Sequence, residues 1–281
     1  MTGPRRAGVL GSPIGHSLSP VLHRAAYLAL GLDWDYDAYD VPEGGLRAFL
    51  ADVDESWAGL SLTMPLKTEA VGLVDEISER ARLVGAVNTI IVSADGLIGH
   101  NTDVPGMIRA LDSVAVDRDA VRSVSIIGAG ATARSALAAV IERQGPSVLI
   151  DVYARSLSRA RGLAELGDAL DAQVSLHPWE EVPVAWQADL VVSTLPGPAA
   201  EDISLPPELM PKLLMDVAYD PWPTALTTRW RTAGGQVASG ADLLLGQALD
   251  QVELMTGREA PAQAMREALF TALSARADGA I

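Results

Sequence analysis

The stretch S-V-S-I-I-G-A-G-A-T-A, residues 123–133, decides the fold of this chain. A short run rich in β-branched residues, 123–127, leads directly into a glycine turn, and apolar residues at helical spacing follow. Gly128 and Gly130 allow a tight turn and a close approach of the backbone to a pyrophosphate, whose charge the N-terminus of the next helix stabilises. In this strand–turn–helix context the G-x-G-x-x-A pattern predicts a dinucleotide-binding domain. The alternative is an ordinary tight turn between a strand and a helix.

The end of the next expected strand, residues 147–153, indicates which dinucleotide is bound. A carboxylate there would bond the ribose 2′-hydroxyl of NAD, whereas an arginine would accept the 2′-phosphate of NADP. The chain continues with A-R-S over 154–156, and its nearest acid, Asp151, lies inside the expected strand. Arg155 and Arg159 lie one helical turn apart and could grip one phosphate from two sides. These arginines favour NADP.

The composition of the whole chain argues against several classes of function. A formal net charge of -15 disfavours nucleic acids and anionic membrane surfaces as partners. The absence of cysteine excludes disulfides and thiolate catalysis, and the four histidines show no metal-ligand spacing, so no metal is expected. We find neither a signal-peptide core nor an apolar run long enough to span a bilayer, and therefore expect a cytoplasmic protein.

Lysine is rare in this chain, which has only Lys67 and Lys212 among its 21 lysines and arginines. Arginine cannot release its proton in a protein, whereas a partly desolvated lysine can. Lys67 ends the run S-L-T-M-P-L-K, residues 61–67, behind a proline and two hydroxyl residues. It is therefore a hypothesis for a proton-transfer group, although a chance survivor is an equally good interpretation of this residue alone.

Short β-branched segments alternate with amphipathic ones along the whole chain, which predicts an α/β fold. We expect Ser19 to cap a helix that begins with Pro20 and ends at Gly31. Two further helices are expected from Ala241, with a break at residues 257–261. The other expected strands cover residues 7–10, 36–41, 59–62, 86–93, 97–100, 189–193, 213–217 and 236–238.

Two α/β domains follow from this pattern. Residues 1–104 with 241–281 are expected to form a substrate-binding and catalytic domain. Residues 105–240 are expected to form a Rossmann-type NADP domain, with the C-terminal helices packing back on the first domain.

Eight short segments of the chain, taken in order, are informative together. They are G-S-P-I-G-H-S-L-S-P (11–20), S-L-T-M-P-L-K (61–67), G-A-V-N-T (85–89), N-T-D (101–103), G-A-G-A-T-A-R (128–134), A-R-S-L-S-R (154–159), D-V-A-Y-D-P-W-P-T (216–224) and S-G-A-D-L-L-L-G-Q (239–247). With these segments the chain resembles the shikimate dehydrogenase family over nearly its whole length. The resemblance implies an NADP-dependent oxidoreductase that reversibly reduces 3-dehydroshikimate to shikimate in chorismate and aromatic amino acid biosynthesis. A small-molecule substrate is therefore expected, and a homodimer is left open.

The resemblance also implies roles for individual residues. Lys67 and Asp103 match the catalytic pair. Substrate binding is implied for Ser17, Ser19, Thr63, Lys67, Asn88, Asp103, Tyr219 and Gln247. Cofactor binding is implied for Gly128, Ala129, Gly130, Ala131, Arg134, Ala154, Arg155, Ser156, Arg159, Thr194, Val217 and Gly240.

Three departures from the family pattern and several alternatives remain. Ser61 stands where many relatives have Asn and shortens a polar reach, Ala154 removes an adenosine contact, and Leu244 replaces a common Met. Gln247 by itself is equally typical of a buried structural amide, and His23 of a packed residue. The alternatives for the whole protein are a quinate/shikimate dehydrogenase that uses NAD(P) and a non-catalytic metabolite sensor.

Overall fold

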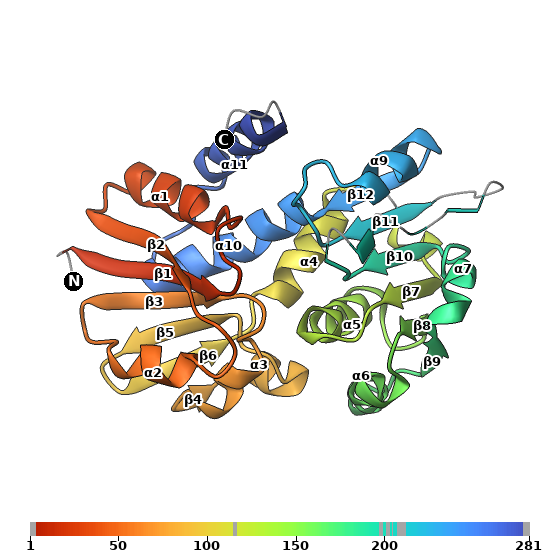
Figure 1. Cartoon of the computed structure of the whole chain (residues 1–281), viewed down its shortest axis with the longest axis horizontal. Helices are drawn as coiled ribbons and strands as arrows, with labels where there is room; N and C mark the ends of the chain where they lie inside the picture. The colour runs from red at the N-terminus through yellow and green to blue at the C-terminus, as the bar shows by residue number, and fades with distance from the viewer. Residues whose placement is uncertain are drawn as a thin grey trace. The chain divides into compact units, whose positions relative to one another are not determined.

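The computed structural model describes residues 4–114, 117–196, 199–200, 203, 205–206 and 212–277. The chain divides into two compact units, Met1–Thr102 with Leu244–Ile281 and Asp103–Leu243 (Figure 1). Each unit contains one six-stranded sheet, and helices accompany both sheets. The two-domain α/β fold predicted from the alternating pattern is therefore confirmed.

The sheet of the first unit is mixed and has the strand order β2-β1-β3-β5-β6-β4. Strands β2 and β3 both pair with β1 in parallel, so the loops that follow β1 and β3 leave the sheet at the same edge. Strand β5 is antiparallel to β3 and β6, and β4 is parallel to β6. The strands are β1 (Arg5–Gly11), β2 (Trp34–Asp40), β3 (Trp57–Leu62), β4 (Glu76–Ile77), β5 (Thr89–Ser93) and β6 (Gly96–His100).

The helices of this unit are α1 (Ser19–Ala29), α2 (Leu46–Ala51), α3 (Glu79–Val84) and α11 (Ala262–Ala277), and α10 (Gly240–Thr256) belongs to it from Leu244 onward. Helix α1 packs against β2 and α11. Helix α10 buries a stripe that includes Ala248, Val252 and Met255. The C-terminal helices thus pack on the first unit, as predicted.

The expected capping role of Ser19 is wrong. The cap position of α1 is Leu18, which makes no side-chain capping hydrogen bond, and Ser19 is the first helical residue. Ser19 is 4% exposed, and its carbonyl oxygen accepts a hydrogen bond of 2.9 Å from His23 Nδ1. The side chain of Ser19 is therefore not used to cap its own helix.

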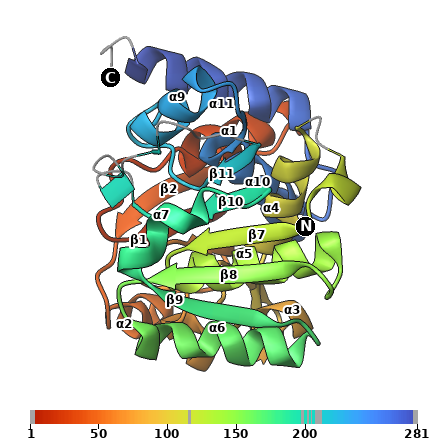
Figure 2. The ribbon, with the colours of Figure 1, turned by 90° about the vertical axis from the view of Figure 1, so that its right-hand side faces the viewer.

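The sheet of the second unit is entirely parallel, with the order β12-β11-β10-β7-β8-β9 (Figure 2). This is the doubly wound order of dinucleotide-binding domains, and the strand order reverses between β7 and β10. The strands are β7 (Ser123–Ile127), β8 (Leu149–Ala154), β9 (Val174–Pro178), β10 (Leu190–Ser193), β11 (Leu213–Asp216) and β12 (Gln236–Ser239). The described helices of this unit include α4 (Asp103–Asp112), α5 (Ala131–Gln144), α6 (Leu157–Ala169), α7 (Val182–Ala185) and α9 (Ala225–Thr232).

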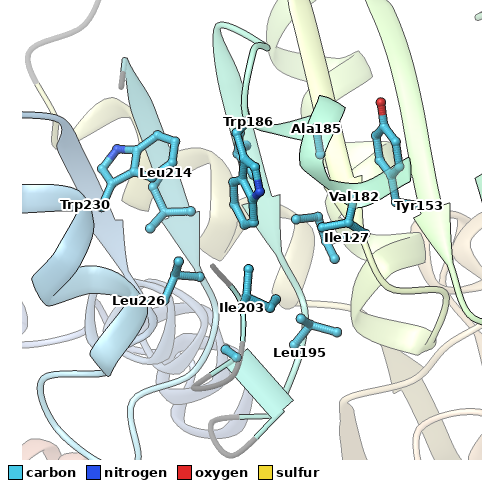
Figure 3. Close-up of a cluster of buried hydrophobic side chains, with 12 residues drawn as sticks. Ile127, Tyr153, Val182, Ala185, Trp186, Leu195, Ile203, Leu214, Leu226 and Trp230 are labelled. Atoms are coloured by element: carbon cyan, nitrogen blue, oxygen red, sulfur yellow. The ribbon is translucent and has the colours of Figure 1, made fainter. Parts of the chain in front are cut away.

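Two tryptophans anchor the core on one side of this parallel sheet (Figure 3). Trp186 follows α7 and Trp230 lies in α9, with ring centroids 6.1 Å apart and ring planes at 55°. Ile127 at the end of β7 and Leu214 in β11 belong to the same cluster. The strand end that leads into the glycine turn is therefore fixed by packing. None of the helices in the described part of the chain is long and apolar enough to cross a membrane.

Candidate functional site

Two loops of the first unit lie together at the carboxyl edge of its parallel strands. The backbone N–H of Ser12, after β1, donates to the carbonyl oxygen of Met64, after β3, at 3.0 Å. A Cβ on Gly11 would lie 2.3 Å from Thr63 Cγ2, so glycine is required for this close approach. Half-buried Ser17 accepts the backbone N–H of Ser19 at 3.3 Å. Of the predicted substrate-binding residues, Ser17 and Thr63 therefore lie in two adjoining loops, and Ser19 begins the helix that follows the first loop.

Lys67 ends the second of these loops and is half-buried. Its carbonyl oxygen accepts a hydrogen bond of 2.8 Å from the backbone N–H of Val87. Val87 directly precedes Asn88, which leads into β5. The backbone that carries Lys67 is thus tied next to a second predicted substrate residue.

A buried cluster of side chains, which we call the amide cluster, surrounds Asn88. Asn88 Nδ2 donates to Thr102 Oγ1 at 2.9 Å, and Asn88 Oδ1 accepts the backbone N–H of Thr102 at 2.7 Å. Thr89 Oγ1 donates to Asn88 Oδ1 at 3.0 Å. Each member is at most 7% exposed, so these bonds form away from bulk water. The cluster consists of Ser61, Asn88, Thr89, Thr102, Gln247 and Gln251.

Two glutamines on α10 complete the amide cluster. Gln247 Nε2 donates to the carbonyl oxygen of Leu244 at 3.1 Å, and its Oε1 lies 3.5 Å from Thr102 Oγ1. Gln251 Oε1 accepts from Ser61 Oγ at 2.9 Å, and its Nε2 donates to Thr89 Oγ1 at 3.0 Å. Sequence reasoning missed Gln251. The available signal was its position one helical turn after Gln247, on the same face of the helix.

Ser61 lies inside this cluster rather than reaching outward. It is 3% exposed, and its hydroxyl accepts from Tyr36 at 2.6 Å as well as donating to Gln251. The amide of Gln251 occupies the space next to the Ser61 hydroxyl. The expectation that serine shortens a polar reach into the substrate site stays a prediction.

Asp103 is the first residue of α4 and is 5% exposed. It directly follows Thr102, whose backbone and hydroxyl are both bonded to Asn88. An aspartate in the first turn of a helix is also stabilised by the helix dipole. The start of α4 is therefore held in place by Asn88.

The glycine turn of the second unit follows β7 at the point where the strand order reverses. Gly128 has φ +120°, and a Cβ there would lie 2.2 Å from Thr194 Oγ1, so the fold itself requires glycine. Thr194 follows β10 and donates its hydroxyl to the carbonyl oxygen of Ile127 at 2.9 Å. By contrast, Gly130 has φ -90°, and a Cβ there would meet nothing within 4 Å.

The protein's own packing therefore does not require glycine at position 130. Gly130 is the cap residue of α5, and no side chain caps the first turn, which begins with Ala131. Together with Ala129 this leaves a small-residue cradle at a helix N-terminus, which suits a pyrophosphate. The residues present fit a dinucleotide at this position.

The side chains that follow β8 differ in exposure. Arg155 and Arg159 are exposed, whereas buried Ala154 ends the strand. Ser156 caps α6 by accepting the backbone N–H of Arg159 at 3.4 Å, so part of its proposed role is structural. Arg134 donates to the carbonyl oxygen of Gly162 at 2.7 Å, and this bond joins α5 to α6.

The acid of β8 is already paired. Asp151 Oδ1 lies 2.8 Å from His177 Nε2, and His177 Nδ1 lies 3.1 Å from Glu181. Burial lowers the pKa of His177, but its hydrogen bonds to Asp151 and Glu181 outweigh this effect, and the net pKa is raised. Asp151 is thus paired with a residue of the neighbouring strand β9. The charged side chains that follow β8 are exposed arginines, which favour NADP.

The loop after β11 is fixed by a buried carboxylate. Thr224 Oγ1 donates to Asp216 at 2.6 Å, and the backbone N–H of Ala218 donates to it at 3.4 Å. Burial raises the pKa of Asp216, against the opposing effect of these hydrogen bonds. Half-buried Val217 and Tyr219 lie in this loop. Sequence reasoning gave Asp216 no role, although it begins the quoted D-V-A-Y-D-P-W-P-T segment.

Gly240 lies against the same loop. A Cβ on Gly240 would lie 2.4 Å from the carbonyl oxygens of both Val217 and Ala218, so α10 begins with backbone packed on backbone. Val217 itself donates its N–H to the carbonyl oxygen of Ser193 at 3.0 Å. Thr194, Val217 and Gly240 are thus connected at neighbouring strand ends. Across the residues that the structure describes, no group of three or more metal-binding side chains could hold a metal ion.

Comparisons with known proteins agree with this geometry. The shikimate dehydrogenase substrate binding domain matches residues 9–90, and the shikimate 5'-dehydrogenase C-terminal domain matches residues 240–270. The NADP(+) shikimate dehydrogenase of Desulforamulus reducens is 33% identical over 275 residues, which cover 93% of each chain.

Solved structures show the same similarity. The shikimate dehydrogenase of Mycobacterium tuberculosis is 36% identical, with a TM-score of 0.83 over 95% of this chain and 100% of the other. The Thermus thermophilus enzyme, in complex with NADP(H) and shikimate, is 32% identical, with a TM-score of 0.83 over 96% of this chain and 100% of the other. The chain belongs to the shikimate dehydrogenase family.

Proposed function

We propose that this protein catalyses the reversible, NADP-dependent reduction of 3-dehydroshikimate to shikimate, a step of chorismate and aromatic amino acid biosynthesis. The observation that carries the proposal is the position of Asn88. It holds Thr102, the residue before Asp103, and directly follows Val87, which bonds the backbone of Lys67. The two segments that carry the proposed catalytic residues are thus tied to one short stretch of chain.

The chemistry assigns different tasks to the two residues. Bound NADPH would supply the hydride, and the protein must deliver a proton to the carbonyl oxygen. The Lys67 ammonium polarises that oxygen and gives it the proton, and it accepts the proton back in the reverse reaction. Asp103 orients the ammonium and stabilises its charge.

Neutral donors hold the substrate carboxylate in this proposal. The chain is strongly acidic as a whole, so an anion must be held by local hydrogen-bond donors. Ser17, Ser19 and Thr63 provide hydroxyls at the N-terminus of α1, whose dipole favours a negative charge. The ring hydroxyls are bound by Lys67, Asn88, Asp103 and Gln247, and Tyr219 lines the pocket.

Residues 105–240 form the NADP-binding domain in this proposal, and residues 1–104 with 241–281 bind the substrate. Gly130 and the N-terminus of α5 hold the pyrophosphate. Arg155 and Arg159 hold the 2′-phosphate by charge-assisted hydrogen bonds. Gly128, Ala129, Ala131, Arg134, Ala154, Ser156, Thr194, Val217 and Gly240 shape the rest of the cofactor site. A cytoplasmic location and a homodimer are part of the proposal, and light scattering of the purified protein tests the dimer.

A four-way assay tests the proposed activity. Purified protein is mixed with shikimate or quinate and with NADP or NAD, and the absorbance of the reduced cofactor is followed. We expect the highest kcat/KM with shikimate and NADP. A higher value with quinate and NAD would instead identify a quinate dehydrogenase, and no rate in any combination would identify a non-catalytic sensor.

A further inference from the structure

We propose that Gln251 is a positioning residue that fixes the orientation of the Asn88 amide, and through it Thr102, from the interior of the first unit. The inference concerns the architecture of the site, and its kinetic consequence rests on the proposed function. The Gln251 side chain is 1% exposed. It acts through Thr89 and Asn88.

The hydrogen bonds that connect Tyr36, Ser61, Gln251 and Thr89 all share one donor-to-acceptor direction. Tyr36 donates to Ser61 Oγ at 2.6 Å, and Ser61 donates to Gln251 Oε1 at 2.9 Å. The Nε2 group of Gln251 must then face Thr89, whose Oγ1 accepts at 3.0 Å. Thr89 Oγ1 also lies 3.3 Å from Thr102 Oγ1, but that oxygen already accepts from Asn88 Nδ2, so the Thr89 proton is directed to Asn88 Oδ1 at 3.0 Å.

This direction decides which way the Asn88 amide points. The Asn88 oxygen receives the hydroxyl of Thr89 and the backbone N–H of Thr102, while its nitrogen donates to Thr102 Oγ1. A flipped amide would place two donors against each other at Thr102 and leave buried groups unpaired, which is costly. Together with the backbone N–H of Thr102, the Thr89 proton that Gln251 directs therefore fixes one of the two orientations.

Ser61 and Gln251 form a complementary pair in this cluster. Ser61 lies directly opposite Thr89 in the β3–β5 ladder, and opposed side chains on antiparallel strands lie about 4.5–5.5 Å apart. A longer amide at position 61 would therefore come within reach of Thr89 if the space of Gln251 were vacated. The short side chain at position 61 and the long one at position 251 together place a single amide beside Thr89.

A spectroscopic experiment tests the positioning without depending on the activity. Gln251→Met keeps the side-chain length but removes both hydrogen-bonding groups. In proton–nitrogen NMR spectra, we expect the Asn88 side-chain amide signals to shift and to exchange faster with solvent in this variant. Tyr27→Phe is the matched control, because it removes a buried hydrogen bond to Met255 Sδ of α10 that lies outside the amide cluster. Unchanged Asn88 signals in Gln251→Met would overturn the proposal.

Kinetics test the consequence for the reaction. Gln251→Met should lower kcat/KM for shikimate by about tenfold, because a small misplacement of binding groups is costly. The KM for NADP should stay within about twofold, since the cofactor residues lie in other segments. Tyr27→Phe should lower the melting temperature but leave kcat/KM nearly unchanged. Equal kinetic losses in both variants would show a merely structural role.

A rescue experiment gives the sharpest test. Gln251→Ala alone should lose activity, and Ser61→Asn in that background should restore kcat/KM to within about threefold of wild type, because the new amide can reach Thr89. Ser61→Asn alone should be harmful, since two amides would compete for one space. A double variant no better than Gln251→Ala contradicts the proposal. A wild type inactive with shikimate would refute the proposed function, whereas the NMR result would still decide the role of Gln251.

Discussion

Asn88 hydrogen-bonds Thr102 through both ends of its side-chain amide: Oδ1 accepts the backbone N–H at 2.7 Å, and Nδ2 donates to Oγ1 at 2.9 Å. Both residues are at most 3% exposed. Thr102 is the last residue before α4, so this contact sets the position from which Asp103 starts. An amide can do this because it offers a donor and an acceptor on one rigid plane.

Replacement of Asn88 by alanine should therefore damage both stability and activity. The backbone N–H of Thr102 loses its Asn88 acceptor, and the hydroxyls of Thr102 and Thr89 each lose one of their partners. An unsatisfied buried group costs about 1–3 kcal/mol. We expect the free energy of unfolding in urea to fall by about that amount. The kcat/KM for shikimate should fall at least about tenfold. Asn101→Ala is the matched control, because it removes a buried bond of 3.0 Å to Ala86. It should cost similar stability and much less activity, and equal activity losses would contradict the role of Asn88.

Lys67→Ala should lower turnover by about two to four powers of ten while NADPH binding, measured by cofactor fluorescence, stays near normal. Lys67→Arg keeps the positive charge but cannot release a proton, so it should restore little of the turnover. Lys212→Ala removes the other lysine, whose amine pairs with Asp189 at the surface. That variant should stay within about 1 kcal/mol of wild-type stability and keep full turnover. Turnover near wild type in Lys67→Ala would refute the assignment.

The strands of the second unit could be predicted because buried parallel strands are short, continuous β-branched runs, as in Ser123–Ile127. The edge strand β9, with the sequence V-S-L-H-P, is only partly buried and carries no such run. Strand β4 has two residues, too few for any periodic pattern. Helix α3 was likewise not predicted, although Ser78 caps it and Gly85 ends it. Strands β4 and β9 thus owe their positions to tertiary contacts rather than to local pattern, whereas α3 carries local signals at both of its ends.

The residues of the proposed site likewise divide into those that local sequence indicates and those that it does not. Residues inside recognisable segments, such as Asn88 and Gly130, could be named from the sequence. Gln251 could not, because its role arises from contacts with residues 162 and 190 positions away in the chain. Asp216 likewise gains its importance only from burial and from Thr224. Local sequence therefore indicates the residues that we propose to contact a ligand better than the residues that hold them in position.

Two glycines of one turn should respond differently to alanine. Gly128→Ala places a methyl group 2.2 Å from Thr194 Oγ1 at a φ of +120°, so it should lower the melting temperature and yield of the protein itself. Gly130→Ala meets no atom within 4 Å and should fold normally. It should nevertheless raise the KM for NADP by about tenfold or more, because the methyl group enters the space proposed for the pyrophosphate. Normal NADP kinetics in Gly130→Ala would refute that placement.

The arginines after β8 should set the preference between cofactors. Arg155→Ala and Arg159→Ala should each raise the KM for NADP and leave the KM for NAD nearly unchanged, because only NADP carries the 2′-phosphate. Each lost charge-assisted bond is worth about 1.5–3 kcal/mol, or roughly tenfold to a hundredfold in KM. Arg161→Ala is the matched control, because Arg161 is exposed on the same helix as Arg159. It should change neither the KM for NADP nor the KM for NAD. Equal losses with both cofactors would argue against 2′-phosphate recognition.

His23 should make the stability of the protein fall in mild acid. Its side chain is fully buried, its ring stacks on Tyr36 at 4.0 Å, and burial lowers its pKa from 6.5 to about 4, despite the opposing hydrogen bond to Ser19. Between these pH values the unfolded chain binds a proton that the folded protein does not, so the free energy of unfolding rises with pH. This contribution is fully present above pH 6.5 and is lost as the pH falls toward about 4.

His23→Phe isolates this effect, because phenylalanine can keep the stacking on Tyr36 but cannot bind a proton. Urea unfolding across the window should show a loss of the order of 3 kcal/mol in the wild type that is absent from the variant. The variant should be less stable than wild type above pH 6.5, since it lacks the hydrogen bond to Ser19, and the two curves should converge or cross in acid. Turnover above pH 6.5 should remain close to wild type, because a buried neutral imidazole takes no part in the proposed proton transfer. Parallel curves for the two proteins would show that His23 is not the group that titrates.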